Sequence, residues 1–242
     1  MSPPLSRKDV HVWFCDLTWC GKDRTALAAL LSSDEQTRAA RFAFERDRHR
    51  FILSHGVLRA ILSRYIDKEA AEIEFATGAY GKPTLNRLSG AAQEIQFSLS
   101  HSGEYALVAV ARGRAVGVDV EACRPEVEAI KLAERFFAAS ESRHVAEASD
   151  DARQRLFYRY WTAKEAYLKG RGIGLSLGLD RFEILFDDQS ALAQVRETDT
   201  GALDTNWHVQ SLSLDAHMAG ALAVEGKAWQ AQMFHVSESS LR

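Results

Sequence analysis

Two stretches with helical spacing, each followed by short strand-like runs, constrain the fold of this 242-residue chain more than any other feature. The first covers residues 33–65, and the second begins near Ser140 and reaches Lys169. In both, apolar residues recur at intervals of three and four, as they do along one face of a helix. The repeated order of helix and strands predicts an α+β fold of two similar halves, each packing a small, mainly antiparallel sheet on helices.

Short runs of β-branched and aromatic residues, interrupted by glycine, predict the strands. They lie at residues 10–16, 95–100, 105–111 and 116–120 in the first half, and at 182–187, 207–212, 218–224 and 229–236 in the second. Short links between the strands from residue 95 to 120 predict an antiparallel meander, which would bring residues 100–103 close to Asp119 and Glu121. We place the join after residue 123, which gives an N-terminal half of residues 1–123, a C-terminal half of residues 124–242 and a cleft where they meet.

The composition narrows the class of protein. Hydrophobic residues make up 46% of the chain and charged residues 26%, as in folded, water-soluble proteins. The formal net charge of −3 argues against non-specific nucleic-acid binding, so any anion site has to be local. Residues 1–9 lack a signal-peptide core, and no apolar run reaches the roughly 18 residues of a membrane span, which favours a cytoplasmic location. Three cysteines without CxxC spacing predict neither disulfides nor a zinc site.

Two acidic residues share one face of a predicted strand. Asp119 and Glu121 are two positions apart, so their carboxylates point to the same side, while Val118 and Val120 point into the core. Adjacent carboxylates suit magnesium, which prefers hard oxygen ligands and fills its other positions with water and phosphate oxygens. A solvated strand edge that carries two acids is the alternative interpretation.

The second long helical stretch carries a polar stripe. Trp161, Glu165 and Lys169 are spaced by four residues and therefore lie on one side of the helix. A separate stripe is expected to face the core, and it contains Leu156, Tyr160, Ala163 and Tyr167. Glu165 and Lys169 are thus left for chemistry, or they form an ordinary ion pair on an exposed face.

Three further features are candidates for binding an anion. Residues 100–103 (Ser-His-Ser-Gly) offer hydroxyls, the imidazole of His101 and a glycine whose backbone can approach an anion closely. Lys82 lies in a Gly-Lys-Pro turn at residues 81–83. The first helical stretch is rich in arginine, a residue whose guanidinium binds phosphate through two parallel bonds; its arginines are Arg38, Arg41, Arg46, Arg48, Arg50, Arg59 and Arg64. For residues 100–103, the alternative is an ordinary surface or capping histidine. For the arginine-rich stretch, the alternatives are a solvated helix face balanced by acidic residues and nucleic-acid binding.

Five motifs together make the sequence similar to a known family. They are YGKP at residues 80–83, FSLSHSG at 97–103, GVDVE at 117–121, RFF at 135–137 and WTAKEAYLK at 161–169. Their order and rough spacing resemble those of the surfactin-type (Sfp-like) 4'-phosphopantetheinyl transferases over nearly the whole chain. GVDVE and the WxxKExxxK helix are the most specific parts, and their joint occurrence is stronger than either motif alone.

The resemblance implies a pseudo-dimeric α+β monomer that binds coenzyme A between its halves. It implies transfer of the 4'-phosphopantetheine group from coenzyme A to a serine of an apo acyl or peptidyl carrier protein, with release of 3',5'-ADP. Magnesium, or manganese in its place, would be the metal cofactor. Fatty acid biosynthesis is one process that uses such carriers, and neither a membrane nor a nucleic acid takes part.

The resemblance also implies roles for individual residues. Those expected to hold the metal are Asp119, Glu121 and Glu165. Those expected at the pyrophosphate are Ser100, His101 and Lys169. Apart from the resemblance, our own hypothesis gives Glu165, Glu141 and a metal-bound water as the candidates for the general base.

Further positions are expected to contact the nucleotide part of coenzyme A. The turn of Gly81, Lys82 and Pro83 matches the family's turn near the adenosine. Arg38 and Arg50 match basic positions near the 3'-phosphate. Glu35 is a departure, because the best-known relatives have lysine there, and Arg41 is the candidate to compensate.

Two other functions are compatible with the same residues. A metal-dependent phosphodiesterase or nucleotide hydrolase would use water as the acceptor and release its product without any carrier protein. A non-catalytic coenzyme A-binding module would bind its ligand in the presence of magnesium and transfer nothing. The presence of all three candidate carboxylates argues against the second of these.

Overall fold

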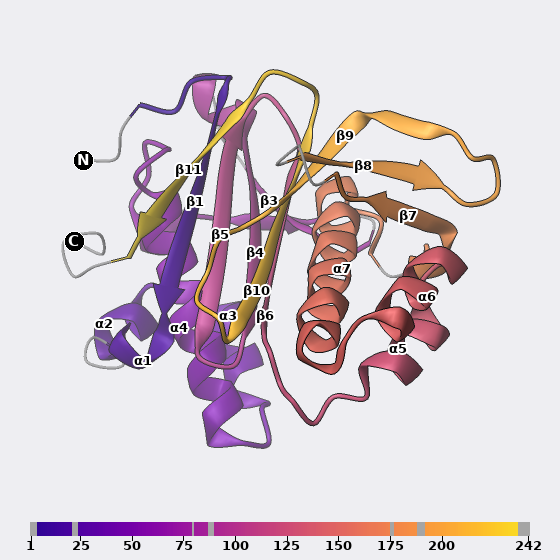
Figure 1. Cartoon of the computed structure of the whole chain (residues 1–242). Coiled ribbons are helices and arrows are strands. Elements are labelled where there is room, and N and C mark those ends of the chain that lie inside the picture. The colour runs from indigo at the N-terminus through magenta and orange to yellow at the C-terminus, as the bar shows by residue number, and fades with distance from the viewer. Residues whose placement is uncertain are drawn as a thin grey trace. The chain divides into compact units, whose positions relative to one another are not determined.

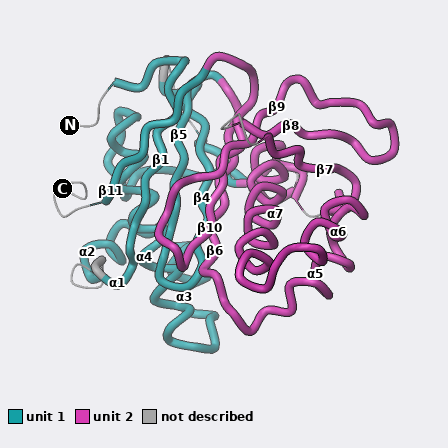
Figure 2. Tube along the Cα trace, in the orientation of Figure 1, with its two compact units in different colours: residues 1–77, 83–113, 229–242 teal, residues 78–82, 114–228 magenta. Residues whose placement is uncertain are grey.

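The computed structural model describes residues 4–20, 24–78, 80–86, 90–174, 177–187 and 192–236. Contacts group the chain into two compact units, shown in Figure 2: unit 1 comprises residues 1–77, 83–113 and 229–242, and unit 2 comprises residues 78–82 and 114–228. Each unit has its own mainly antiparallel sheet and its own helices (Figure 1), which confirms the predicted α+β class. The units divide after residue 113, and the predicted domain boundary after residue 123 stays a prediction.

Unit 1 is built on a four-stranded sheet in the order β11-β1-β5-β4. Its strands are β1 (Asp9–Asp16), β4 (Ile95–Ser102), β5 (Tyr105–Arg112) and β11 (Gln230–His235). β5 pairs antiparallel with β1 and β4, whereas β11 runs parallel to β1. A separate two-stranded sheet pairs β2 (Phe75–Thr77) with β3 (Pro83–Leu85).

The last strand of the chain belongs to the first sheet, although its position in the sequence suggested the second half. β11 covers the edge of β1, where the ring of Phe234 stacks on that of Trp13 at a centroid distance of 4.8 Å. Covering this edge satisfies backbone groups of β1 that would otherwise face solvent.

The helix predicted over residues 33–65 is two helices, α3 (Ser33–Ala40) and α4 (Glu45–Leu62), which follow α1 (Leu17–Cys20) and α2 (Arg24–Ala29). A capping box begins α3, because the Glu35 amide donates to Ser32 Oγ (3.3 Å) and the Ser32 amide donates to Glu35 Oε2 (2.9 Å). The extended backbone of Phe44 (φ −108°, ψ 130°) separates α3 from α4. Gly56 lets α4 pack closely on α2, since a Cβ there would lie 2.8 Å from the carbonyl oxygen of Leu27.

Unit 2 is built on a five-stranded antiparallel sheet in the order β6-β10-β9-β8-β7. Its strands are β6 (Val116–Ala122), β7 (Phe182–Leu185), β8 (Leu192–Glu197), β9 (Leu203–Ser211) and β10 (Met218–Glu225). Its helices are α5 (Ala129–Phe136), α6 (Ala139–Glu147) and α7 (Asp150–Arg171). The extended backbone of Ala148 (φ −64°, ψ 146°) interrupts the predicted helical run and separates α6 from α7.

The core of unit 2 lies between α7 and the sheet. Tyr160, Ala163 and Tyr167, three of the four residues predicted to face the core, are buried. α7 ends at Gly172, whose positive φ of 65° is the left-handed conformation common at helix C-termini. No helix among the described residues is long and apolar enough to cross a membrane.

The predicted meander of three strands is wrong. β4 and β5 pair as expected, but the other side of β5 is occupied by β1, so β6 has no place next to β5. β6 pairs instead with β10 in unit 2. The topological reason for expecting residues 100–103 beside Asp119 and Glu121 therefore falls away.

Candidate active site

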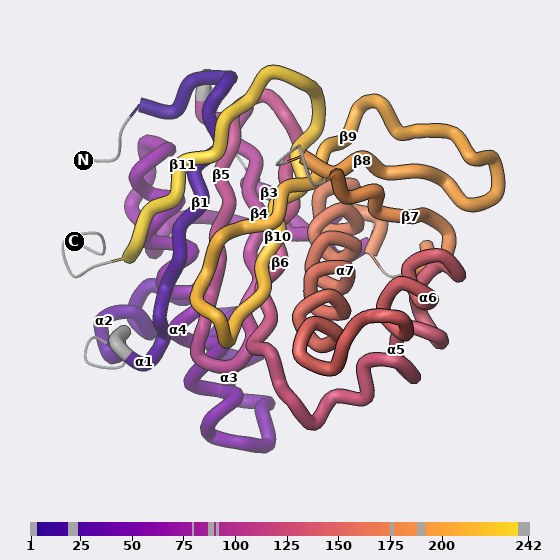
Figure 3. The backbone as a smooth tube through the Cα atoms, viewed as in Figure 1, coloured from indigo at the N-terminus to yellow at the C-terminus, as the bar shows by residue number. Residues whose placement is uncertain are grey.

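β6 and α7 lie backbone to backbone because both carry glycine where they meet (Figure 3). A Cβ on Gly117 would lie 2.0 Å from the carbonyl oxygen of Ala166 and 2.2 Å from the amide nitrogen of Gly170. No real Cβ contact is this short, so only glycine fits in β6 at this position. The close approach decides which side chains of the strand and the helix come together.

Asp119 and Lys169 form an ion pair beside this contact, with 2.6 Å between Oδ1 and Nζ. Asp119 is only 3% exposed because α7 covers its face of the strand, whereas the side chain of Lys169 is 33% exposed. The alternative of a solvated strand edge therefore does not hold for Asp119. Lys169 bonds across to the strand, so the alternative of a surface pair within one helix does not describe it either.

Glu165 lies one helical turn before Lys169. Burial raises the pKa of its carboxyl, the negative charge of Asp119 raises it further, the ammonium of Lys169 lowers it, and Glu121 raises it again. Charges shift a pKa in this way only from nearby positions. The three carboxylates predicted as metal ligands therefore lie within electrostatic reach of one another.

The carboxylate cluster, defined as Asp119, Glu121 and Glu165, has the chemistry of a site for a hard divalent cation. Its donors are all carboxylate oxygens, and one of them, Asp119, pairs with Lys169. In the part of the chain that the structure describes, no three His, Cys, Asp or Glu side chains are arranged as a finished metal site. Metal coordination by the cluster thus stays a prediction. Its carboxylate oxygens are the kind of ligand that a hard divalent cation binds.

The side chain of Lys82 anchors its turn to β6 and α7 within unit 2. Its ammonium donates to the carbonyl oxygens of Val116 (2.9 Å) and Gly170 (3.0 Å), at the place where β6 and α7 meet. Burial lowers the pKa of Lys82 to about 8. Gly81 provides the positive φ of 87° in this turn, and Pro83 begins β3. A contact between this turn and the adenosine stays a prediction.

The other predicted ligand contacts lie in unit 1. The Nε of Arg50 donates to Glu104 (3.0 Å), and the guanidinium of Arg38 lies over the ring of Phe51, 5.2 Å from its centroid. Arg41 is exposed. On the edge strand β4, Ser100 is buried and His101 is exposed. Their roles toward a ligand stay predictions.

Glu35 has a structural partner that explains an acid at this position. Its Oε2 lies 2.7 Å from Nε of Arg59, a side chain that is 1% exposed. Arg59 also donates from Nη1 to the carbonyl oxygens of Ala70 and Ile73, at 2.9 Å each. The sequence offers no periodic signal for this pair because its members lie 24 residues apart.

Glu141 lies in the interior of unit 2. It is 2% exposed, its Oε2 lies 2.7 Å from the ammonium of Lys164, and its Oε1 accepts from the amide of Ile184 (2.7 Å). Lys164 is fully buried and also donates to the carbonyl oxygens of Leu179 and Phe182. Burial raises the pKa of Glu141, and the charge of Lys164 opposes this. Glu141 therefore ties α6 and α7 to β7, and a role as general base stays a prediction.

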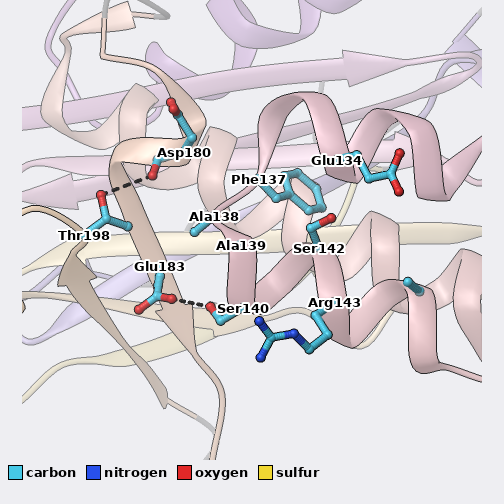
Figure 4. Close-up of a pocket in the computed structure, with 11 residues that line it drawn as sticks. Glu134, Phe137, Ala138, Ala139, Ser140, Ser142, Arg143, Asp180, Glu183 and Thr198 are labelled. Atoms are coloured by element: carbon cyan, nitrogen blue, oxygen red, sulfur yellow. Dashed lines mark hydrogen bonds between the residues drawn. The ribbon is translucent and has the colours of Figure 1, made fainter.

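Cavities lie among the elements of unit 2. A cavity of about 700 Å³ lies between α5, α6 and β7, and Figure 4 shows Ser140 donating to Glu183 and Thr198 bonding to Asp180 at its wall. No member of the carboxylate cluster lines it. A smaller cavity of about 210 Å³ has Glu121 at its edge.

Sequence reasoning missed the residues that shape this smaller cavity. Leu132 and Phe157 line it together with Trp161, which had been noted only as part of the polar stripe. The helical spacing of Phe157 and Trp161 was a usable signal. The glycine in GVDVE was another, since glycine within a strand often marks close approach of a second backbone.

Comparison with known proteins identifies relatives over both units. Residues 115–224 match the family described as the 4'-phosphopantetheinyl transferase superfamily, and residues 18–113 match that described as 4'-phosphopantetheinyl transferase, N-terminal. The 4'-phosphopantetheinyl transferase HetI of Nostoc sp. is 37% identical over 233 residues, which cover 96% of this chain and 94% of the relative.

Further relatives come from other organisms. A phosphopantetheinyl transferase of Thraustochytrium sp. is 32% identical over 93% of this chain and 81% of its own length. The 4'-phosphopantetheinyl transferase Sfp of Bacillus subtilis is 31% identical over 64% of this chain and 66% of its own. Among solved structures, the holo-[acyl-carrier-protein] synthase (AcpS) of Thermotoga maritima aligns with 47% of this chain and 63% of its own, at 27% identity and a TM-score of 0.38.

Proposed function

Because this chain belongs to the 4'-phosphopantetheinyl transferase superfamily and transfers phosphopantetheine to carrier proteins, we propose that its carboxylate cluster holds the divalent cation of that reaction. The observation that carries this proposal is the raised pKa of Glu165: burial raises it most, and the charges of Asp119 and Glu121 on the neighbouring strand raise it further. Like charges gathered in this way disfavour ionisation unless a cation compensates them. Magnesium is the ion that such oxygen ligands suit.

When bound, magnesium, or manganese in its place, supplies positive charge to the diphosphate oxygens of coenzyme A. The chain's own contribution is to hold the ligands in place. The glycine contact between β6 and α7 sets the separation of Asp119 and Glu165, and the burial of Asp119 restricts its side chain. Ligands held before the substrate arrives need no reorganisation during the reaction.

Lys169 neutralises charge on the leaving group. Its ammonium is held at Asp119, yet its side chain is one-third exposed, so it can reach a phosphate oxygen without leaving the cluster. As the phosphorus–oxygen bond breaks, the electron pair departs with 3',5'-ADP, and a nearby ammonium stabilises that charge.

We assign the general base to Glu165 rather than to Glu141. Glu165 is half-buried on the side of α7 that carries Lys169, so a serine hydroxyl can approach its carboxylate. Glu141 is enclosed and already accepts bonds from Lys164 and the Ile184 amide. In the transfer, the carrier serine oxygen bonds to the phosphorus that carries pantetheine, and its proton passes to Glu165.

The remaining assignments follow the family resemblance. Coenzyme A is the donor, and its further contacts are proposed at Arg38, Arg41, Arg50, Gly81, Lys82, Pro83, Ser100 and His101. We also propose that the chain acts as a cytoplasmic monomer on acyl or peptidyl carrier proteins, including those of fatty acid synthesis. Sedimentation of the purified protein tests whether it is a monomer. Competition between carrier proteins in the transfer reaction tests which of them the enzyme prefers.

The decisive experiment compares the chain with its Asp119→Asn variant, which keeps the shape of the buried side chain. Each protein is mixed with coenzyme A, magnesium and an apo acyl carrier protein, and the carrier is weighed by mass spectrometry. We expect the phosphopantetheine adduct only with the unmodified chain, and magnesium binding by calorimetry to be lost in the variant. Glu128→Gln, which changes an exposed acid, is the matched control.

Three outcomes separate the alternatives. An Asp119→Asn variant that modifies the carrier at the normal rate would show that the metal assignment is wrong. Release of 3',5'-ADP without any carrier protein would point to a hydrolase. Tight binding of coenzyme A with no transfer to any carrier would point to a binding module.

A further inference from the structure

The side chain of Lys82 joins a strand and a helix that both carry residues of the proposed active site. Its ammonium donates to the carbonyl oxygen of Val116 in β6 (2.9 Å) and to that of Gly170 in α7 (3.0 Å). Val116 lies three residues before Asp119, and Gly170 directly follows Lys169. A single cation from a separate segment of unit 2 thus bridges the two backbones that present Asp119 and Lys169.

The end of α7 favours a cation at this place. The last carbonyls of a helix have no partner inside the helix, and the helix dipole makes that end negative. Gly170 lies in the last turn of α7, which ends at Arg171. The stem of Lys82 passes Gly172, where an added Cβ would lie 3.4 Å from Cδ of the lysine. The ammonium therefore reaches a position where the helix itself stabilises positive charge.

The turn at residues 78–82 holds Lys82 in place. The amide of Gly78 donates to the carbonyl oxygen of Lys82 (2.9 Å), and the amide of Gly81 donates to that of Gly78 (3.0 Å). The positive φ of Gly81, 87°, lets the chain close this turn. Because the backbone of Lys82 is fixed in this way, its ammonium can hold the strand and the helix without further ordering of its own segment.

The contact at Gly117 keeps β6 and α7 from moving closer, but it does not keep them together. Close packing resists compression, whereas hydrogen bonds from one group to both backbones resist separation and sliding. The ion pair of Asp119 and Lys169 (2.6 Å) also joins them, yet both of its side chains are assigned to ligands during transfer. The ammonium of Lys82 can keep its two carbonyl partners while the substrate is bound.

We propose that Lys82 is a positioning residue for the transfer reaction, which fixes the register of α7 against β6 and so holds Glu165 near Asp119. This inference rests on the proposed function. In this role the ammonium does not touch the reacting atoms, and any contact between Lys82 and coenzyme A comes from its backbone. A shift of α7 by one residue would move its side chains by about 1.5 Å, and a misplacement of this size costs about a hundredfold in rate.

Lys82→Met tests this role, because methionine is close to lysine in length but lacks the charge and the donors. Magnesium affinity, measured by calorimetry, should fall about tenfold, as when other supports of metal ligands are lost. The kcat for transfer should fall about a hundredfold, while the affinity for coenzyme A at saturating magnesium stays unchanged. Lys227→Met, which changes an exposed lysine in the turn after β10, is the matched control and should leave all three quantities unchanged.

Two further variants separate positioning from a general loss of structure. Lys82→Arg keeps the charge and the donors, so it should recover most of the magnesium affinity and of the transfer rate. A cycle with Lys169→Met shows whether Lys82 acts through the active site. If it does, Lys82→Met should slow transfer much less in a chain that already carries Lys169→Met than in the unmodified chain.

Several results would overturn the proposal. A normal kcat with weaker coenzyme A binding in Lys82→Met would make the ammonium a ligand contact. A lower thermal midpoint with normal kcat and normal magnesium affinity, or no recovery in Lys82→Arg, would leave it without a positioning role. Equal losses from Lys82→Met in the two backgrounds would place its effect outside the active site. Failure of the cation proposal is seen separately, as magnesium binding and transfer that survive in Asp119→Asn.

Discussion

Glu35 accepts a hydrogen bond from the buried side chain of Arg59, with 2.7 Å between Oε2 and Nε. Replacing Glu35 by Gln should lower the free energy of unfolding by about 3 kcal/mol, because Arg59 is left as a buried charge without its counter-ion. Coenzyme A affinity of the folded variant should be unchanged. Urea unfolding and calorimetry measure the two quantities.

Glu104→Gln is the control for that variant. It removes the more exposed pair with Arg50 and should change the free energy of unfolding by less than about 1 kcal/mol. If Glu35→Gln instead weakened coenzyme A binding at normal stability, Glu35 would belong to the ligand site.

Replacing Glu165 by glutamine and replacing Glu141 by glutamine should change the stability of the protein in opposite directions. Burial, and after it the neighbouring carboxylates, raise the folded-state pKa of Glu165. Its ionised form therefore costs stability at neutral pH, and Glu165→Gln should raise the thermal midpoint. The same variant should lose at least about a hundredfold in transfer rate, as expected for removal of a general base. Calorimetric scans and kcat at saturating coenzyme A check both effects.

Glu141→Gln should instead lower the free energy of unfolding by about 3 kcal/mol, because Lys164 keeps its charge in the interior. Protein that remains folded should transfer at a near-normal rate. Loss of transfer at unchanged stability would return Glu141 to the list of candidate bases.

Gly117→Ala should separate β6 from α7. Its Cβ would lie 2.0 Å from the carbonyl oxygen of Ala166, and neither backbone can move aside cheaply. We expect the free energy of unfolding to fall by about 3 kcal/mol or more, together with weaker magnesium binding. Gly201→Ala is the control: nothing lies near its added Cβ, and only its positive φ of 70° should cost about 1 kcal/mol. Equal losses in the two variants would mean that close packing at Gly117 is unimportant.

Acid should destabilise unit 1 through two histidines. Burial lowers the pKa of His11, and it lowers that of His55 to about 4, with the charge of His101 adding to the effect. Between pH 4 and the unfolded value near 6.5, the unfolded state binds more protons at His55, so stability falls as the pH is lowered through this range.

Each such histidine contributes a slope of up to about 1.4 kcal/mol per pH unit. Urea unfolding at pH 5 and pH 7 should therefore show a smaller difference for His55→Gln than for the unmodified chain. An identical difference in both proteins would mean that His55 protonates equally well in the folded state.

Local patterns predicted most elements because they report on neighbours in sequence. Alternation in GVDVE and the four-residue spacing of Trp161, Glu165 and Lys169 identified β6, α7 and their polar faces. The capping box of Ser32 and Glu35 is equally local, since all of its atoms lie within one helical turn.

The pairing of strands that lie far apart in the sequence could not be predicted, because no local sequence pattern specifies which strands become neighbours. The meander failed since β1, nearly 90 residues upstream, takes the side of β5 that β6 was expected to occupy. Lys82 and Glu141 were predicted as functional from their residue types, but their contacts depend on carbonyls and amides supplied by distant segments.

During synthesis on the ribosome, β1 emerges long before its parallel partner β11. The sheet of unit 2 ends at residue 225, so all of its strands are available before β11 is made. Until then one side of β1 is a bare edge that can recruit another chain. A chain that stops just before Gln230 would thus expose the edge of β1 and be prone to aggregation, so β11 protects the sheet of unit 1 against pairing with other chains.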